Sequence, residues 1–228
     1  MYKPLNLLLI ALFIASLATD VTRAAEEEKA PDEDAVRCAN LVYSENKTSV
    51  CFSDAFLQQA ERDTNLVTEK KFTPTRLDSD KLFAFPLSVM TGEGSFELTP
   101  EQRINLRSYL TAGGFMIASA GCSSMSWADA FRREIKRVFP DRPLVKLDAE
   151  HPIYSTVYDV TSSRFRTGGA RLPHLAALEV DGRVVMVFSP DGLNDSASEG
   201  GDCCCCGGNE VKSAKKRYVN ILSYELTH

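Results

Sequence analysis

The stretch TPEQRINLRSYLTAGGFMIAS, residues 99–119, contains a helix followed directly by a strand. Thr99 and Gln102 have the spacing of a capping box, with a proline at the first helical position, where a missing N–H costs nothing. The pair Gly113-Gly114 supplies a left-handed stop, and Phe115–Ser119 is a short apolar strand. A capped helix that leads into a buried strand is half of a βαβ unit.

The chain on both sides of this stretch continues the alternation of strands and helices. We expect strands over 36–43 and 82–90, the second buried on both faces as in parallel sheets. We expect a helix over 52–62 capped by Ser53, and a helix that begins at Ser126 and ends at Pro140. The latter would bury Trp127, Phe131, Ile135 and Val138. The repeated pattern predicts an α/β sandwich with a mainly parallel sheet.

The C-terminal third of the chain differs from the rest. Strands over 175–180 and 183–188 are joined by Asp181-Gly182, the pair that a type I′ turn favours, so a β-hairpin is expected. A helical pattern resumes over 218–226. The basic run 212–217 is interpreted as the exposed face of that helix, because charge runs are usually solvated.

The N-terminal segment has the pattern of a signal peptide. Lys3 precedes an apolar run of about 14 residues over 5–18, short of the roughly 20 that a membrane span needs. Residues 1–25 are therefore predicted to be a signal peptide and 26–35 an acidic linker. The domain over 36–228 would be exported to the periplasm or the outside, or held at the inner membrane by 5–18 if the segment is retained.

The composition is that of an ordinary soluble globular protein. Apolar residues make up 44%, charged residues 25%, and the net charge is −5. Nucleic acid requires a basic excess that this chain lacks, so it is excluded as a partner. The partner is expected to be a protein or a small molecule, with a membrane involved only if the N-terminal segment remains.

Several motifs resemble one bacterial family. The segments FPLSVMTGEG (85–94), TPEQRINLRSYLTAGGF (99–115) and FRREIKRVFPD (131–141), with HPIY at 151–154, are similar to the DUF4159 family. This resemblance implies a class I glutamine amidotransferase-like fold, which is a flavodoxin-like three-layer sandwich. It does not imply amidotransferase chemistry, because one fold hosts many functions.

Cys122 occupies the position that a nucleophile would take in that fold, between a strand and a helix. The two glycines of a G-x-C-x-G elbow are missing, because Ala120 and Ser124 stand at their positions, and the late His-x-Glu pair is absent. Apart from the terminal His228, the late histidines are His151 and His174. His151 before Pro152 indicates a turn. A thiol without a base is a poor nucleophile at neutral pH, so a buried structural Cys122 is the alternative.

Ligands of doubly wound sheets bind outside the carboxyl ends of the strands. The residues predicted at those ends, and therefore as a ligand site, are Ser44, Glu93, Gly94, Ser119, Gly121 and Asp191. If the second strand of the hairpin runs parallel to the main sheet, the loop after it leaves from the same edge as Cys122.

That loop carries four consecutive cysteines, Cys203, Cys204, Cys205 and Cys206. Alternate side chains of an extended backbone point to opposite sides, so two of the four could join Cys122 around a thiolate-bound metal such as zinc. An exported protein also meets oxidising conditions, which favour disulfides. The seven cysteines leave at least one unpaired, and Cys38 and Cys51 form a possible separate pair.

Three functions remain open from the sequence. The first is a non-enzymatic module that binds a ligand or partner at the strand ends. The second is a thiolate metal or redox site, and the third is an amide or ester hydrolase that uses Cys122.

Overall fold

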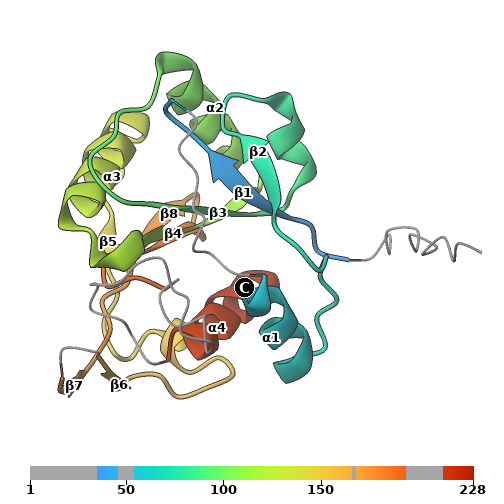
Figure 1. Ribbon diagram of the computed structural model, residues 1–228, viewed down its shortest axis with the longest axis vertical. Coiled ribbons are helices and arrows are strands. Elements are labelled where there is room, and N and C mark those ends of the chain that lie inside the picture. Colours follow the sequence, from blue (N-terminus) through green and yellow to red (C-terminus); the bar gives the residue numbers. More distant parts are fainter. Residues whose placement is uncertain (1–34, 46–53, 166–167, 194–212) are drawn as a thin grey trace, which may run out of the picture. The chain divides into compact units, whose positions relative to one another are not determined.

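A seven-stranded sheet forms the centre of the structure, a computed structural model that describes residues 35–45, 54–165, 168–193 and 213–228 (Figure 1). Its strands in spatial order are β2 (Thr73–Arg76), β1 (Cys38–Val42), β3 (Leu87–Gly92), β4 (Phe115–Ala120), β9 (Arg183–Ser189), β8 (Ala176–Val180) and β5 (Val145–Lys146). The first five are parallel, and β8 is antiparallel to both of its neighbours.

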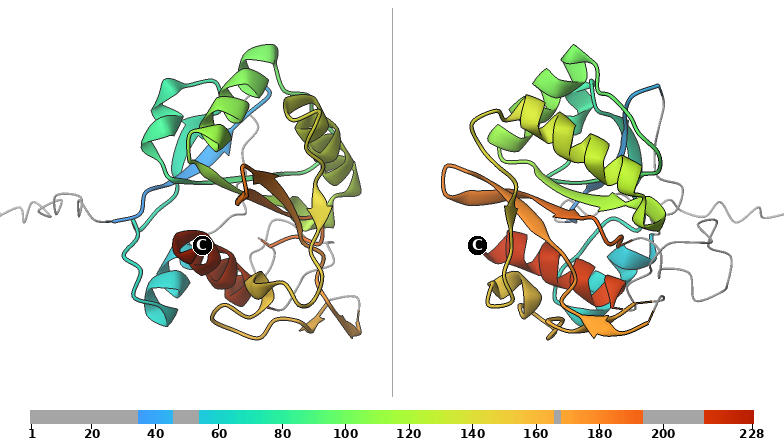
Figure 2. Two further views of the ribbon diagram at one scale, coloured as in Figure 1. Left: turned by 180° about the vertical axis from the view of Figure 1, so that it is seen from behind. Right: turned by 90° about the vertical axis from the view of Figure 1, so that its left-hand side faces the viewer.

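Helices cover both faces of the sheet. α1 (Ala55–Asp63) and α4 (Ala214–Thr227) pack together on one face, and α2 (Pro100–Thr111) and α3 (Met125–Val138) on the other (Figures 1 and 2). Each face has its own apolar core. The order of the first four strands, 2-1-3-4, is the flavodoxin-like one, so the predicted three-layer sandwich with a mainly parallel sheet is confirmed.

Short elements complete the described chain. Three 3₁₀ helices are η1 (Asp80–Ala84), η2 (Gly121–Ser123) and η3 (Pro152–Tyr154), and a small separate hairpin is formed by β6 (Ser163–Arg164) and β7 (Ala170–Arg171). Among the residues described, no helix is both long and apolar enough to cross a membrane.

The helix caps and turns predicted from the sequence are confirmed at three places. Both halves of the capping box between Thr99 and Gln102 are formed. Gly113 follows α2 with φ of 111°. Asp181 and Gly182 have φ of 53° and 82°, the left-handed pair of a type I′ turn between β8 and β9.

Two predictions about elements were wrong, and strand β2 was missed. The strand expected over 82–90 begins at Leu87, because 80–84 form η1 and Pro86 interrupts the run between them. α3 is capped by Ser124, not by Ser126, since the hydroxyl of Ser124 accepts the Trp127 amide. β2 was not predicted, because its sequence Thr-Pro-Thr-Arg carries no apolar run. Ser53, expected to cap α1, lies outside the described residues.

The basic run at 212–217 was also misread. α4 begins at Ala214, and Arg217 is only 1% exposed, whereas Lys216 beside it is exposed. Arg217 falls on the helical stripe of Ala214, Tyr218 and Ile221, which packs toward the sheet. Helical phase, and not charge, decides which residue of the run is buried.

Candidate functional site

The carboxyl edge of the sheet has two places where neighbouring strands lead to opposite faces. β1 is followed by α1 and β3 by α2. The connections after these two neighbouring strands therefore lead to opposite faces of the sheet. β4 is followed by α3, and the next helix after β9 is α4. The helices that follow these two neighbouring strands thus also lie on opposite faces (Figure 2). Doubly wound proteins bind ligands at such points.

The gap between β1 and β3 is filled on the α2 and α3 face by Tyr43. Its ring is fully buried, and its hydroxyl donates a 3.0 Å hydrogen bond to the carbonyl of Thr91. Burial raises the pKa of Tyr43, so the phenol stays protonated. Ser44, predicted to bind ligand, has its amide bonded to Oε1 of Gln102 at 3.1 Å, which connects this turn to the start of α2.

Glu93, Gly94 and Gly121 are brought together where β3 and β4 end. The amide of Gly94 donates to Oγ of Ser124 at 3.2 Å. A Cβ at Gly121 would lie 3.0 Å from the Gly92 carbonyl oxygen and 3.3 Å from Cγ of Glu93. The turn after β4 therefore packs directly on the turn after β3, and a glycine is needed for that approach.

Ser119 and Asp191 join the ends of β4 and β9. Oγ of Ser119 accepts the Leu193 amide at 2.7 Å, and Oγ of Ser123 donates to the Asp191 carbonyl at 2.9 Å. β9 runs parallel to β4, as the hypothesis about this edge required. Of the six residues predicted as a ligand site, all except Ser44 thus lie along one line of contacts from β3 to β9.

The Asp191 carboxylate lies close to two basic residues, contacts that were not predicted from the sequence. It accepts a 2.7 Å hydrogen bond from the His174 amide, and the Nδ1 atom of the His174 ring is 3.4 Å away. Nη2 of Arg171 lies 3.7 Å from the other carboxylate oxygen. His174 comes just before β8, so the antiparallel hairpin is what places it beside the end of β9.

A cavity of about 400 Å³ opens at this edge on the α3 face. Its walls are apolar, and three basic side chains complete its lining. The apolar residues are Leu144, Leu175, Ala176, Phe188 and Pro190, and the basic residues are Arg132, Lys146 and His174. The guanidinium of Arg132 lies 5.2 Å from the centre of the Phe188 ring, which is cation–π geometry.

The cysteines are only partly described. Cys122 is placed by its backbone in η2, and the next residue, Ser123, has a left-handed φ of 53°. Cys51 and the predicted metal ligands Cys203 to Cys206 lie outside the described residues. Cys38 is buried as a free thiol, and burial raises its pKa. Within the described ranges, no group of three or more His, Cys, Asp or Glu side chains could hold a metal ion.

His151 has the turn role that Pro152 predicted. Its Nδ1 accepts the Ile153 amide at 3.3 Å, which caps η3. The ring lies 5.3 Å from that of Tyr224 on α4, and partial burial lowers its pKa.

The fold and this edge define a doubly wound α/β protein with a cluster of polar groups at the carboxyl ends of its strands. Residues 37–226 match the model of the family described as Domain of unknown function (DUF4159), and the chain belongs to that family. No curated protein matches the sequence.

Proposed function

We propose that this chain is an exported, non-enzymatic module that binds a small molecule or a partner at the carboxyl edge of its sheet. The cavity beside the end of β9 carries the proposal, because its 400 Å³ lies within the size range of small-molecule sites. The missing elbow glycines and the missing His-x-Glu pair support a role in binding.

The lining of the cavity indicates the ligand. Five of its eight residues are apolar, which suits an apolar body, and Arg132, Lys146 and His174 suit an acidic group. A small organic acid with an apolar body combines both features.

The test uses benzoate and amide NMR spectra of the full chain. We expect shift changes centred on Leu175, Ala176 and Phe188, and weaker binding after Lys146→Gln. Lys70→Gln, which also removes an exposed lysine charge, is the matched control, because Lys70 pairs with Glu61 away from the cavity. Shift changes confined to other surfaces, or none at all, would refute the cavity as a binding site.

A thiolate metal or redox site is the second candidate. The parallel course of β9 and the bond between Leu193 and Ser119 support it, because the chain leaves β9 at the edge where Cys122 stands. Cys122 and two of Cys203 to Cys206 would hold an ion such as zinc. Elemental mass spectrometry of protein purified without chelator would show near-stoichiometric metal, lost after Cys→Ser changes at 203–206. Metal-free protein removes the metal site, and unchanged redox behaviour of those variants removes the redox site.

A hydrolase that uses Cys122 is the third candidate. The left-handed turn at Ser123 and the pair of His174 with Asp191 at the adjoining strand end favour it. Iodoacetamide at pH 8 should then label Cys122 in the folded, reduced protein, while buried Cys38 stays unlabelled. An unreactive Cys122, or no thiol-dependent hydrolysis of amides and esters, eliminates this candidate.

Export is proposed from the N-terminal pattern of residues 1–25. Mass analysis of the full chain produced in a bacterium distinguishes the two routes. Loss of 1–25 from a soluble product supports cleavage, and the full-length chain in the membrane fraction supports the anchor over 5–18.

A further inference from the structure

Three hydroxyl side chains form a row across the carboxyl ends of β3, β4 and β9. Thr91 is in register with Ser119, and Ser119 with Ser189. All three are fully buried. Because side chains alternate along a strand, these three share a face with Val89, Ile117 and Val187, whose core is the one that α1 and α4 complete. The row thus lies on the opposite face from the cavity.

Arg217 reaches this row from α4. Its side chain is 1% exposed, and Nη2 lies 3.4 Å from Oγ of Ser189, which is a long hydrogen bond. In the part of the chain that the structure describes, Nε and Nη1 of Arg217 have no hydrogen-bond partner, and neither has Oγ1 of Thr91. Two polar side chains at one strand edge are therefore buried with unused hydrogen-bonding capacity.

A buried guanidinium destabilises the folded protein unless an anion neutralises its charge. A buried donor without a partner costs about 1–3 kcal/mol, and more when it is charged. Burial lowers the pKa of Arg217 to about 10, so the guanidinium is still charged at neutral pH. The carboxylate whose charge acts on Arg217 is that of Asp191, which already engages His174 and Arg171.

We propose that Arg217 and the hydroxyls of Thr91, Ser119 and Ser189 form a binding site for an oxyanion, the phosphate or carboxylate group of a small ligand. A guanidinium holds two oxygens of such a group through paired N–H donors. Hydroxyl groups can donate to further oxygens. Arg171, 3.7 Å from the Asp191 carboxylate, offsets the charge of that acid, so the charge of Arg217 is left for a ligand. The site is independent of the cavity on the other face.

The test measures binding of inorganic phosphate and, in a parallel arm, acetate to the full-length chain at constant ionic strength. Isothermal titration and the thermal midpoint are the readouts. We expect at least one anion to bind the wild type and to raise its thermal midpoint. Arg217→Gln should weaken the affinity for that anion by at least about 10-fold. Thr91→Val removes a hydroxyl with little change of volume and should weaken binding several-fold. Binding of phosphate alone assigns a phosphate ligand, and binding of acetate alone a carboxylate.

Two matched variants separate this site from its surroundings. Lys216→Gln removes a positive charge from the exposed neighbour on the same helix, and Lys146→Gln removes one from the cavity. Lys216→Gln should keep the wild-type affinity, whereas a loss of affinity in Lys146→Gln would place the anion in the cavity. The proposal is overturned if neither anion binds, if Arg217→Gln and Thr91→Val bind as the wild type does, or if Lys146→Gln is the variant that loses binding. Should Arg217→Gln fail to fold, Thr91→Val still decides.

Discussion

Nε of Arg103 lies 2.8 Å from Oε2 of Glu134 and joins α2 to α3 across an almost fully buried carboxylate. Nη1 of Arg137 holds the other oxygen at 2.7 Å. Glu97 in turn contacts both arginines at the surface. The two helices on this face are thus connected by charge as well as by apolar packing.

Replacement of Glu134 by alanine should lower the free energy of unfolding by about 3 kcal/mol, because it leaves the partly buried guanidinium of Arg103 without its main partner. Chemical denaturation measures the loss. Asp129→Ala breaks the exposed pair with Arg132 on the same helix and should cost less than about 1 kcal/mol. Equal costs for the two changes would show that burial of Glu134 contributes nothing.

Tyr43→Phe removes one hydroxyl that serves two buried partners. The hydroxyl donates to the Thr91 carbonyl and accepts the indole Nε1 of Trp127 at 2.7 Å. The phenylalanine would leave both without a partner, so we expect a loss of about 1–3 kcal/mol in urea denaturation. Stability within about 0.5 kcal/mol of the wild type would mean that other groups replace the hydroxyl.

Gly92→Ala should be strongly destabilising. A Cβ at this position would lie 2.2 Å from the Tyr43 hydroxyl and 2.9 Å from Nε1 of Trp127. Gly94→Ala is the control, because its Cβ meets nothing within 4 Å and only the left-handed φ of 71° opposes it. We expect thermal midpoints in the order wild type, Gly94→Ala, Gly92→Ala; a reversed order of the variants would contradict the packing at this turn.

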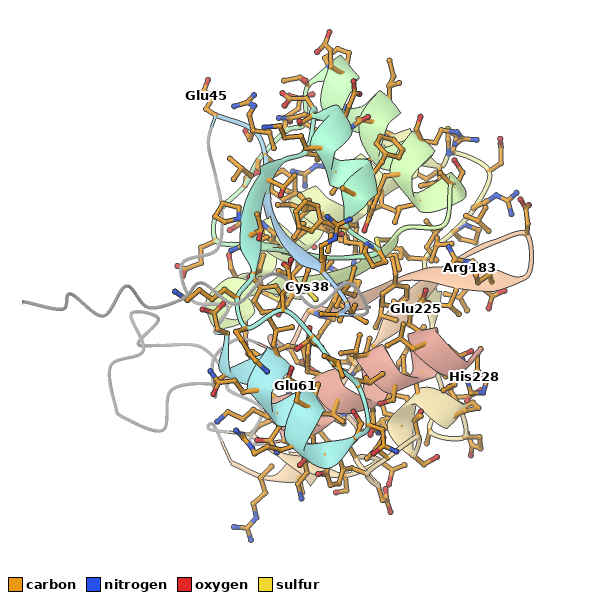
Figure 3. The ribbon with its side chains drawn as sticks, turned by 90° about the vertical axis from the view of Figure 1, so that its right-hand side faces the viewer. Cys38, Glu45, Glu61, Arg183, Glu225 and His228 are labelled. Carbon is orange, nitrogen blue, oxygen red and sulfur yellow. The ribbon has the colours of Figure 1, made fainter. Side chains whose placement is uncertain are left out.

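Glu225 predicts a pH dependence of stability. It lies on α4 and pairs with Arg183 of β9 at 2.9 Å (Figure 3). Burial raises its pKa from 4.5 to about 7, and the arginine only partly opposes this shift. Between these pH values the folded state holds a proton that the unfolded state has released. The contribution of Glu225 to the free energy of unfolding is therefore complete below pH 4.5 and is lost as the pH rises through 7.

Glu225→Gln should remove that dependence. Denaturation of the two proteins from pH 4 to 8 should show the wild type losing stability relative to the variant, by roughly 1–3 kcal/mol, in this window. Glu179→Gln on the exposed side of β8 should follow the wild type. A constant difference between wild type and Glu225→Gln over the whole range would refute the raised pKa.

Local chemistry explains which parts of the fold were predictable. The capping box at Thr99, the stop at Gly113 and the turn at Asp181 depend on residues close in sequence, and they formed as expected. The 3₁₀ helix over 80–84 did not follow from its apolar composition, because short apolar runs do not distinguish strand from helix.

The site was predictable only in outline. Strand ends at one edge follow from a parallel sheet, which is why Ser119, Gly121 and Asp191 were found together. The approach of His174 to Asp191 depends on the register of β8 and β9, which the sequence does not state. Burial of Arg217 could have been found from its helical phase with Ala214 and Tyr218, had its charge been given less weight.

The position of α4 has a consequence for how the protein is made. This helix ends at Thr227, yet Tyr218, Ile221 and Leu222 complete the core that begins with Cys38 and Phe56. Until the ribosome has released the chain through these residues, one side of the sheet exposes its apolar side chains while the other can already close. A nascent chain therefore presents a half-covered sheet, which is the form that a holding chaperone would recognise.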